Sequence, residues 1–387
     1  MPENNLYYIY IDSKIEGTID QLMGYFQAKV FYPEDCICIY FKYYKGIEKY
    51  IKNKFNSTKI HYKFIRKNSD FFFERDKIVF YLFNAQSNCR VVANRHLTHV
   101  FVTHGESHKL ASIKPILRIY DFVITSGKVG IERLLRAGIF NLSNVHKENR
   151  IIPMGNTFIG QHHYRYNATS EVLLYAPTWE GGVIEENYSS VSQQAENILS
   201  HLIEKNTINH LMIQLHPNLG HRDKSYIHHL KQLIKNLKKK NIKITIIKST
   251  IQMSDRLRFS GCNLIAKSRM STTMVKAAVV DISAMEIQCF SEYIPTLVLY
   301  RAARLMDLII PERVKYLYDL DKSMDLYNIN YFDFNIRAAE MESHRDYLIS
   351  YQKPHLVELS FQARIHWLCH FVQEKKQEIT QQSLDIF

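Results

Sequence analysis

The sequence predicts an α/β protein with two domains, each built on a parallel sheet. Short apolar runs alternate with helix-like segments along the chain, which is the pattern of strand–helix–strand units around parallel sheets. The chain has 387 residues, enough for two domains of about 150–200 residues each. Apolar residues make up 46% of it, so both domains can bury an ordinary core.

The first half contains six expected strands. They are the short apolar runs Leu6–Ile11, Ile37–Phe41, Ile60–Ile65, Ile78–Leu82, Val100–Thr103 and Phe122–Thr125. Helix-like segments lie between several of them, for example Ile15–Ala28 and Gly46–Asn53. The polar, turn-rich segment Arg165–Glu171 follows and marks the expected domain boundary. Residues 1–165 are therefore predicted to form an N-terminal Rossmann-like domain.

The second half repeats the alternation. Strands are expected at Val172–Ala176, Leu211–Leu215, Ile242–Ile247, Ala278–Ile282 and Thr296–Leu299. Helices are expected at Val191–Lys205, Tyr226–Lys240 and Ser283–Glu292. These elements predict a second Rossmann-like domain over residues 166–330. Residues 331–387 are predicted to be helices that pack back across the domains, with Pro354 interrupting an amphipathic stretch.

The net charge of +12 favours anionic partners. The densest basic stretch is Lys231–Lys243. Leu230, directly before it, and Leu233, Ile234 and Leu237 within it recur at helical spacing. The lysines are therefore expected on the solvated face of a helix, and attraction to an anionic membrane surface is the alternative. No nucleic-acid-binding motif is present, so no nucleic-acid partner is expected.

The sequence predicts neither a membrane-spanning nor a secreted chain. No apolar run reaches about 18 residues, and the N-terminus lacks the basic region and apolar core of a signal peptide. The six cysteines show neither zinc spacing nor a small disulfide scaffold. The expected location is the cytoplasm, with peripheral attachment to the inner face of the cell membrane as an option.

The segment Phe101–Lys109 carries the first candidate site. An expected strand ends there and is followed by His104, Gly105, Glu106 and Lys109. A neutral imidazole at a sheet edge can take a proton from an incoming hydroxyl. The lysine can face an anionic group in the same crevice.

Three later strand ends also carry polar groups. These groups are Thr178, Trp179 and Glu180, then His216, then Asp281 and Ser283. Each set taken alone also fits a purely structural role. Trp179 can fill a gap in the core, His216 can be a structural histidine with its hydrogen bonds satisfied, and Ser283 can simply cap a helix. Because the carboxyl ends of parallel strands meet at one sheet edge, together they predict phosphate donors and a helix N-terminus in one cleft. This is what transfer from a nucleotide-activated donor requires. No P-loop motif is present, so P-loop kinase or ATPase chemistry is not expected.

At these residues the chain resembles the CDP-glycerol glycerophosphotransferase family, which includes teichoic acid and capsule polymer transferases. The family's HG-[DE]-S-x-K pattern is similar to His104–Lys109, and its YAPTWEG pattern is similar to Tyr175–Gly181. The resemblance spans about Asn84 to Tyr300. Further similar positions are Tyr120, Asp121, Gly127, Glu132, Arg133, Asn187–Ser190, His216, Pro217, Asp281, Ser283 and Pro295.

The resemblance implies a GT-B architecture, in which an N-terminal acceptor-side domain and a C-terminal donor-binding domain face a central cleft. The family moves glycerol phosphate, or a related polyol phosphate, from a CDP-linked donor to an acceptor hydroxyl. His104 takes the role of general base, with Lys109 and Glu106 as further catalytic residues. The expected acceptor-side residues are Gly105, Ser107 and Arg133. The expected donor-binding residues are Thr178, Trp179, Glu180, His216, Asp281, Ser283, Ala284, Glu286 and Gln288.

Five positions depart from the family pattern. Gln214 replaces a basic residue, Ala284 a serine, and Gln288 an aspartate; Glu286 is an additional carboxylate, and His108 replaces an aspartate. Since most of these changes lie in the donor half, they leave the identity of the donor open.

The expected activity is therefore transfer of a polyol phosphate to a cell-surface glycan or polymer, with a lipid-linked acceptor as one option. One alternative is a GT-B glycosyltransferase that uses a CMP- or UDP-sugar in capsule or lipooligosaccharide synthesis. Another is a non-catalytic protein that binds a nucleotide or a polymer. No metal ligands and no cofactor are predicted, although Asp281 is a weak candidate ligand for Mg²⁺. The sequence also allows a homo-oligomer.

Overall fold

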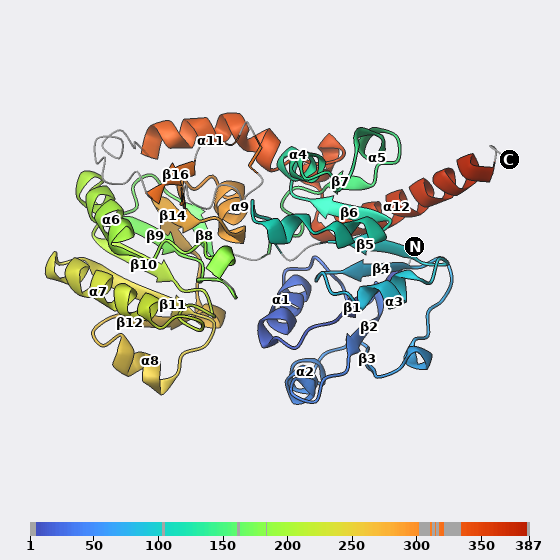
Figure 1. Ribbon diagram of the computed structural model, residues 1–387, viewed down its shortest axis with the longest axis horizontal. Helices are drawn as coiled ribbons and strands as arrows, with labels where there is room; N and C mark the ends of the chain where they lie inside the picture. The colour runs from blue at the N-terminus through green and yellow to red at the C-terminus, as the bar shows by residue number, and fades with distance from the viewer. Residues whose placement is uncertain are drawn as a thin grey trace. The chain divides into compact units, whose positions relative to one another are not determined.

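The protein is described by a computed structural model that covers residues 5–102, 105–160, 163–182, 184–301, 310–311, 314, 317–320 and 334–384. The chain divides into two compact units. The first consists of Met1–Glu106, Ile113–Gln161 and Asp346–Phe387, and the second of Ser107–Ser112 and His162–Arg345. Each unit contains one seven-stranded parallel sheet (Figure 1). The predicted class, α/β with two parallel-sheet domains, is confirmed, and the cleft between them stays a prediction.

The sheet of the first unit has the strand order β3-β2-β1-β4-β5-β6-β7. All neighbouring strands are parallel, and all five residues of β1 are buried. Parallel strands are covered on both faces, which is why they appear in the sequence as continuous apolar runs. The strands are β1 (Tyr7–Ile11), β2 (Cys36–Lys42), β3 (Tyr62–Ile65), β4 (Ile78–Tyr81), β5 (Thr98–Phe101), β6 (Phe122–Thr125) and β7 (Ile151–Pro153).

Helices from both ends of the chain complete the first unit. Ile19 and Leu22 of α1 enter the same core as Leu368 and Val372 of α12, near the C-terminus. The helices are α1 (Glu16–Gln27), α2 (Glu48–Phe55), α3 (Asn88–Val92), α4 (Lys128–Arg136), α5 (Leu142–His146) and α12 (Phe361–Leu384). Pro354 begins the 3-10 helix Pro354–Glu358, so the predicted interruption of the C-terminal helical region is confirmed.

The sheet of the second unit has the order β12-β11-β10-β9-β14-β15-β16, again with parallel neighbours. Its strands are β9 (Val172–Ala176), β10 (His210–Gln214), β11 (Lys243–Lys248), β12 (Asn263–Ala266), β14 (Ala277–Asp281), β15 (Thr296–Tyr300) and β16 (Leu317–Asp319). A separate parallel pair is formed by β8 (Tyr164–Tyr166) and β13 (Thr273–Val275).

Helices α6 and α7 of the second unit each bury an apolar face in the core of this unit. Leu230, Leu233, Ile234 and Leu237 of α7 are all buried, which confirms the predicted solvated face for its lysines. The helices are α6 (Gln193–Lys205), α7 (Ser225–Lys239), α8 (Met253–Arg258), α9 (Ala284–Ser291) and α11 (Phe334–Leu348), which passes into the first unit at Asp346. None of the helices in the described ranges is long and apolar enough to cross a lipid bilayer.

Candidate active site

The strand order of the second unit reverses between β9 and β14. From β9 the chain continues through β10, β11 and β12 on one side, whereas β14 and β15 lie on the other. Ligands of open α/β sheets bind outside the carboxyl ends of the strands at such a point. Thr178 follows β9 and Asp281 ends β14, so two of the predicted donor-binding residues lie there.

Asp281 connects the loops around this point. The side chain is fully buried, and its Oδ2 accepts hydrogen bonds from the backbone N–H groups of Thr178 at 2.7 Å and Ser190 at 3.0 Å. Burial raises the pKa of Asp281 to about 6, although these hydrogen bonds and Lys109 act in the opposite direction. Asp281 therefore holds the chain after β9 in place through these two hydrogen bonds.

Lys109 supplies a positive charge to the same place. Its Nζ lies 3.2 Å from Oγ1 of Thr178 and 4.9 Å from the centre of the Tyr188 ring. Burial lowers the pKa of Lys109 to about 8, while Asp281 and Glu186 at longer range favour its charged form. Among the described residues, the direct partners of this ammonium are thus a neutral hydroxyl and an aromatic ring. Such a group can accept an anionic ligand.

His216 lies at the end of β10 in a stack with Trp179. The two ring centres are 5.8 Å apart and the planes differ by 7°. Burial, followed by the charge of Lys109, lowers the pKa of His216 to about 4, so the imidazole is neutral at pH 7. Nδ1 lies 3.2 Å from the N–H of Asn218 and accepts from it, which leaves the proton on Nε2. Nε2 can therefore donate to a phosphate oxygen.

Glu180 organises a loop with its carboxylate. It is fully buried and accepts hydrogen bonds from the N–H groups of Gly220 at 2.9 Å, Arg222 at 2.9 Å and Asp223 at 3.0 Å. Burial alone would raise the pKa of Glu180, but these backbone donors lower it. The side chain of Arg222 in turn donates to the carbonyl groups of Glu180 and Gly181. The predicted donor-binding carboxylate therefore holds the loop after β10 against the loop after β9.

Helix α9 begins beside this site. Ser283 is its N-cap, and the Ser283 Oγ accepts from the N–H of Met285 at 3.3 Å. Ala284 is the first helical residue and adds only a methyl group there. Gln288 is in the last turns of this eight-residue helix, farther from its N-terminus. The helix N-terminus supplies partial positive charge at the carboxyl end of β14.

Glu286 in the first turn of α9 pairs with His108. Nε2 of His108 lies 3.0 Å from Oε1 of Glu286, and both side chains are fully buried. Both residues depart from the family pattern, and the structure joins them although 178 positions separate them in the chain. The pair holds the segment Ser107–Ser112, and with it Lys109, within the second unit. Ser107 is buried in this segment, with its Oγ 3.3 Å from Oγ of Ser112.

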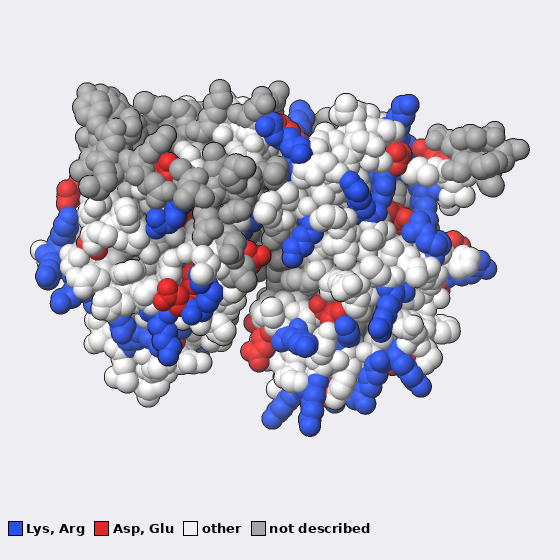
Figure 2. All heavy atoms as spheres, in the orientation of Figure 1, with Lys and Arg blue, Asp and Glu red and all other residues white. Residues whose placement is uncertain are grey.

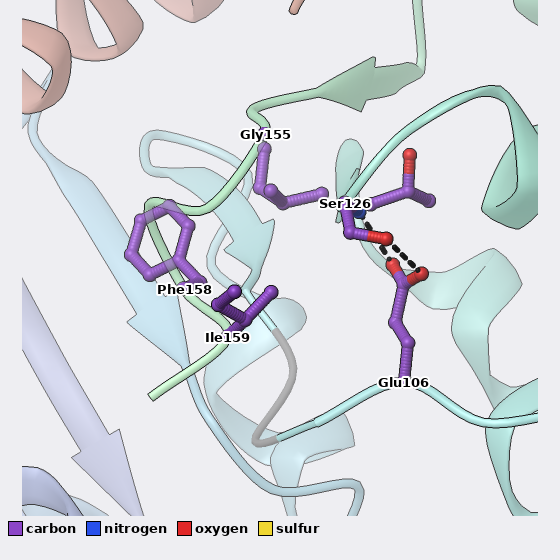
Figure 3. Close-up of a pocket in the computed structure, with 7 residues that line it drawn as sticks. Glu106, Ser126, Gly155, Phe158 and Ile159 are labelled. Atoms are coloured by element: carbon purple, nitrogen blue, oxygen red, sulfur yellow. Dashed lines mark hydrogen bonds between the residues drawn. The ribbon is translucent and has the colours of Figure 1, made fainter. Parts of the chain in front are cut away.

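Glu106 belongs to the first unit and lines a small pocket there. Its carboxylate accepts from the N–H and the hydroxyl of Ser126, both at 2.9 Å (Figure 3). Nη1 of Arg133 lies 3.5 Å from Oε2 of Glu106, and Arg133 is only 2% exposed. The pocket lies beyond the carboxyl end of β6, and its lining comprises Glu106, Ile124, Thr125, Ser126, Gly155, Phe158 and Ile159.

Two glycines allow this local arrangement. A Cβ on Gly130 of α4 would lie 2.6 Å from Cβ of Thr125 and 3.0 Å from Oε2 of Glu106. Gly105 has a φ of 141°, a conformation that favours glycine, and it precedes Glu106 directly.

His104, the predicted base, lies outside the described residues. The site around Lys109 and the pocket at Glu106 are therefore described within separate units.

The sequence interpretation missed several residues of the site. Ser189 and Ser190 were not among the predicted site residues, but the N–H of Ser190 donates to Asp281 and Oγ of Ser189 donates to the Thr178 carbonyl at 2.9 Å. Tyr188 and Arg222 also contribute contacts. The run from Asn187 to Ser190 in the family resemblance was the available signal. Within the described residues, no group of three His, Cys, Asp or Glu side chains is arranged to hold a metal ion.

No protein-family model matches the chain, and no curated protein matches it. Among solved structures, the chain is similar to MurG of Acinetobacter baumannii at 8% identity and a TM-score of 0.47, covering 95% of this chain and 99% of that one. A glycosyltransferase of Rickettsia africae ESF-5 has 13% identity and a TM-score of 0.41, covering 98% and 99%. The lipopolysaccharide outer core galactosyltransferase WaaB has 12% identity and a TM-score of 0.44, covering 93% and 98%.

Proposed function

We propose that this chain is a transferase that moves glycerol phosphate, or a related polyol phosphate, from a CDP-activated donor to a hydroxyl of a cell-surface glycan or polymer. The observation that carries the proposal is the grouping of Lys109, Thr178 and His216 at the strand-order reversal of the second unit. A lysine ammonium, a hydroxyl and a neutral imidazole N–H are suitable donors to a diphosphate. The GT-B architecture and the reaction of the CDP-glycerol glycerophosphotransferase family are proposed on the basis of the sequence resemblance.

The proposed reaction is a direct displacement at phosphorus. The acceptor oxygen forms a bond to the phosphorus that carries the polyol, and the bond from this phosphorus to the bridging oxygen breaks. CMP leaves with the electron pair of that bond. His104, by resemblance, takes the proton of the acceptor hydroxyl, while Lys109 and His216 stabilise charge on the donor phosphates. This chemistry depends on positioning and charge stabilisation and needs no covalent enzyme intermediate.

Nucleotide binding tests the donor half of the proposal. Calorimetric titration with CDP, CMP, UDP and GDP should show preferred binding of cytidine nucleotides. Lys109→Ala should weaken CDP binding about 10- to 100-fold because it removes a charge-assisted contact. The matched control is Lys114→Ala, which removes an exposed lysine of the first unit. Failure of the chain to bind any of the four nucleotides would refute the proposal and favour a non-catalytic protein.

Transfer itself is tested with His104→Ala. This variant should lose transfer and keep CDP binding nearly unchanged, because the base acts on the acceptor. Mass spectrometry of the product should show the addition of glycerol phosphate or another polyol phosphate.

A second candidate is a glycosyltransferase that uses a CMP- or UDP-sugar in capsule or lipooligosaccharide synthesis. Its basis is the departures from the family pattern, which leave the donor open: Gln214 stands in place of a basic residue and donates to Sδ of Met285 at 3.1 Å, and Glu286 is an additional carboxylate that pairs with His108. A product that gains a hexose or a sialic acid would support this candidate over the first.

We infer further that the protein works in the cytoplasm, peripherally attached to the inner face of the cell membrane, on a glycan or polyol-phosphate acceptor that is lipid-linked. Its net charge of +12 supports attraction to an anionic surface. We propose in addition that the chain forms a homo-oligomer, which light scattering tests. We also propose that Mg²⁺ contributes to the transfer reaction, which addition of a chelator tests.

A further inference from the structure

Helix α8 exposes two large apolar side chains to solvent. Met253 is 76% exposed and Leu257 is 79% exposed, the two highest values among the large apolar side chains of the described residues. Because they are four positions apart, they lie on the same side of the helix. Arg256 and Arg258 are exposed as well. We call these four residues the α8 tip.

Helix α8 is held in place by residues outside the α8 tip. Oδ2 of Asp255 accepts from the N–H of Gln252 at 3.0 Å and caps the helix, and Oδ1 of Asp255 pairs with Lys248 at 2.6 Å. Phe259, the residue after the helix, is 3% exposed and enters the core. The apolar groups of Met253 and Leu257 therefore serve no packing role within the described residues.

The stretch of chain that contains the α8 tip is strongly basic. The segment Ser225–Met270 contains eleven Lys and Arg residues and one acidic residue, so it carries +10 of the net +12 of the chain. The acidic residue is Asp255, which is 1% exposed and neutralised by Lys248. The charge that this segment presents to solvent is therefore almost entirely positive.

The lysines of α7 are close to the α8 tip in space. Nζ of Lys238 donates to the carbonyl of Ser260 at 2.9 Å, so the C-terminal end of α7 lies beside the turn after α8. Figure 2 shows a mostly white tip at the place of α8, with blue spheres gathered next to it over α7. Apolar side chains that protrude from a basic surface are the signature of proteins bound at the membrane interface.

We propose that the α8 tip and the basic face of α7 bind an anionic phospholipid surface. Met253 and Leu257 enter the headgroup region, and Arg256, Arg258 and the lysines of α7 contact the lipid phosphates. RNA binding would favour aromatic side chains for base stacking, and the tip presents none. A second copy would bring like charges together. This inference deepens the membrane attachment in the proposed function and rests on it.

The position of α8 gives this attachment a direction. Helix α8 follows β11, which is parallel to β10 and, through it, to β9. It therefore begins on the side of the sheet where Thr178 and His216 lie. Attachment through the α8 tip keeps the donor-binding edge of the second unit near the bilayer, where a lipid-linked acceptor is located.

Sedimentation with lipid vesicles tests the proposal, without donor or acceptor, so that its failure leaves the proposed transfer reaction untouched. The full chain should bind vesicles of phosphatidylcholine with phosphatidylglycerol, and bind vesicles of phosphatidylcholine alone far more weakly. Met253→Ser with Leu257→Ser should weaken the binding about 10-fold. The matched control is Phe72→Ser, which removes an apolar side chain of the first unit that is 74% exposed.

The charges are tested in the same assay. Arg256→Gln with Arg258→Gln should weaken binding to the anionic vesicles about 30-fold at low salt. Lys59→Gln with Lys63→Gln removes the same charge from the first unit and should change binding by no more than about 2-fold. Calorimetric nucleotide binding and circular dichroism establish that each variant is folded.

Three results would overturn the proposal. The first is equal binding to neutral and anionic vesicles, and the second is unchanged binding by the Met253 and Leu257 double variant. The third is binding of a homopolymeric RNA, or dimer formation in light scattering, that depends on the α8 tip while vesicle binding is absent.

Discussion

Lys109 is the residue on which the proposed donor chemistry depends most. Its ammonium is partly buried beside Thr178 and Tyr188, and burial holds its pKa at about 8. A lysine with an ordinary pKa of about 10.4 stays charged well above neutral pH, whereas Lys109 loses its charge as the pH rises through about 8. Affinity for an anion at this site should therefore depend on pH.

The first prediction follows from this lowered pKa. Since an anion binds the protonated form, CDP affinity should be complete below the pKa of about 8 and decline as the pH rises above it. Lys109→Arg should flatten the profile, because the pKa of a guanidinium group is about 12 or higher and the group stays charged throughout this pH range. His216, with a pKa of about 4, is neutral on both sides of this range and adds no step. Calorimetric titration of CDP across this pH range measures the profile, and an identical decline in Lys109→Arg would disprove the assignment.

The second prediction concerns the pair between His108 and Glu286. Glu286→Ala leaves a fully buried imidazole without its hydrogen-bond acceptor and should destabilise the protein by about 1–3 kcal/mol. It should also weaken CDP binding, since the pair positions the segment that carries Lys109. Glu286→Gln keeps an acceptor oxygen and should lose less of both.

Urea unfolding and CDP titration measure the two effects. Glu204→Ala is the control, because its pair with Lys240 is exposed and should contribute at most about 1 kcal/mol. Equal losses in Glu286→Ala and Glu204→Ala would show that the buried pair has no special role.

At the scale of elements, helix α4 approaches the end of β6 closely enough to require a glycine. In Gly130→Ala the new methyl group would collide with Thr125 and press on the Glu106 carboxylate. We expect a loss of about 1–3 kcal/mol of stability from the overpacking. Gly24→Ala in α1 has open space within 4 Å and should gain about 0.5–1 kcal/mol. Thermal unfolding followed by circular dichroism compares the two, and a shift of the same sign in both would contradict this account.

Elements differ in how well the sequence predicts them. The buried strands, such as β9 and β6, were predicted with the bounds that the structure shows, because strands covered on both faces are uninterrupted apolar runs. The short edge strand β12 was missed, since its residues are exposed or only partly buried. The three residues of β7 and the pair of β8 with β13 are too short for a periodic pattern.

The site was predicted only in part for a related reason. Strand ends point to one sheet edge, so Thr178, His216 and Asp281 could be grouped from the sequence. Which of them contacts a ligand and which one shapes a loop depends on packing between distant segments. The three backbone N–H groups that Glu180 accepts come from the loop after β10, and the partner of His108 lies far away in the chain, so the sequence did not reveal either contact.

At the scale of the whole molecule, the first unit depends on the last helix of the chain. Leu368 of α12 is fully buried in the core that also contains Ile9 and Ile39. Leu368→Ala should therefore cost about 2–5 kcal/mol, and the loss should be local to the first unit. Limited proteolysis with mass spectrometry should show earlier cleavage of the strands β1 to β4, while α6 and α7 stay protected. Gln377→Ala, on the exposed side of α12, is the control, and equal exposure of both units would contradict the prediction.

This use of the C-terminal residues has a consequence during synthesis on the ribosome. The first unit contains Asp346–Phe387, whereas the second unit ends at Arg345. The sheet of the first unit is made early but lacks part of its core until Asp346–Phe387 has been synthesised, and the second unit can close before that. Domains usually fold in the order in which they are made. In this protein the unit that is started first is completed after the second, so a ribosome that stalls soon after Arg345 leaves the core of the first unit open to proteases and chaperones.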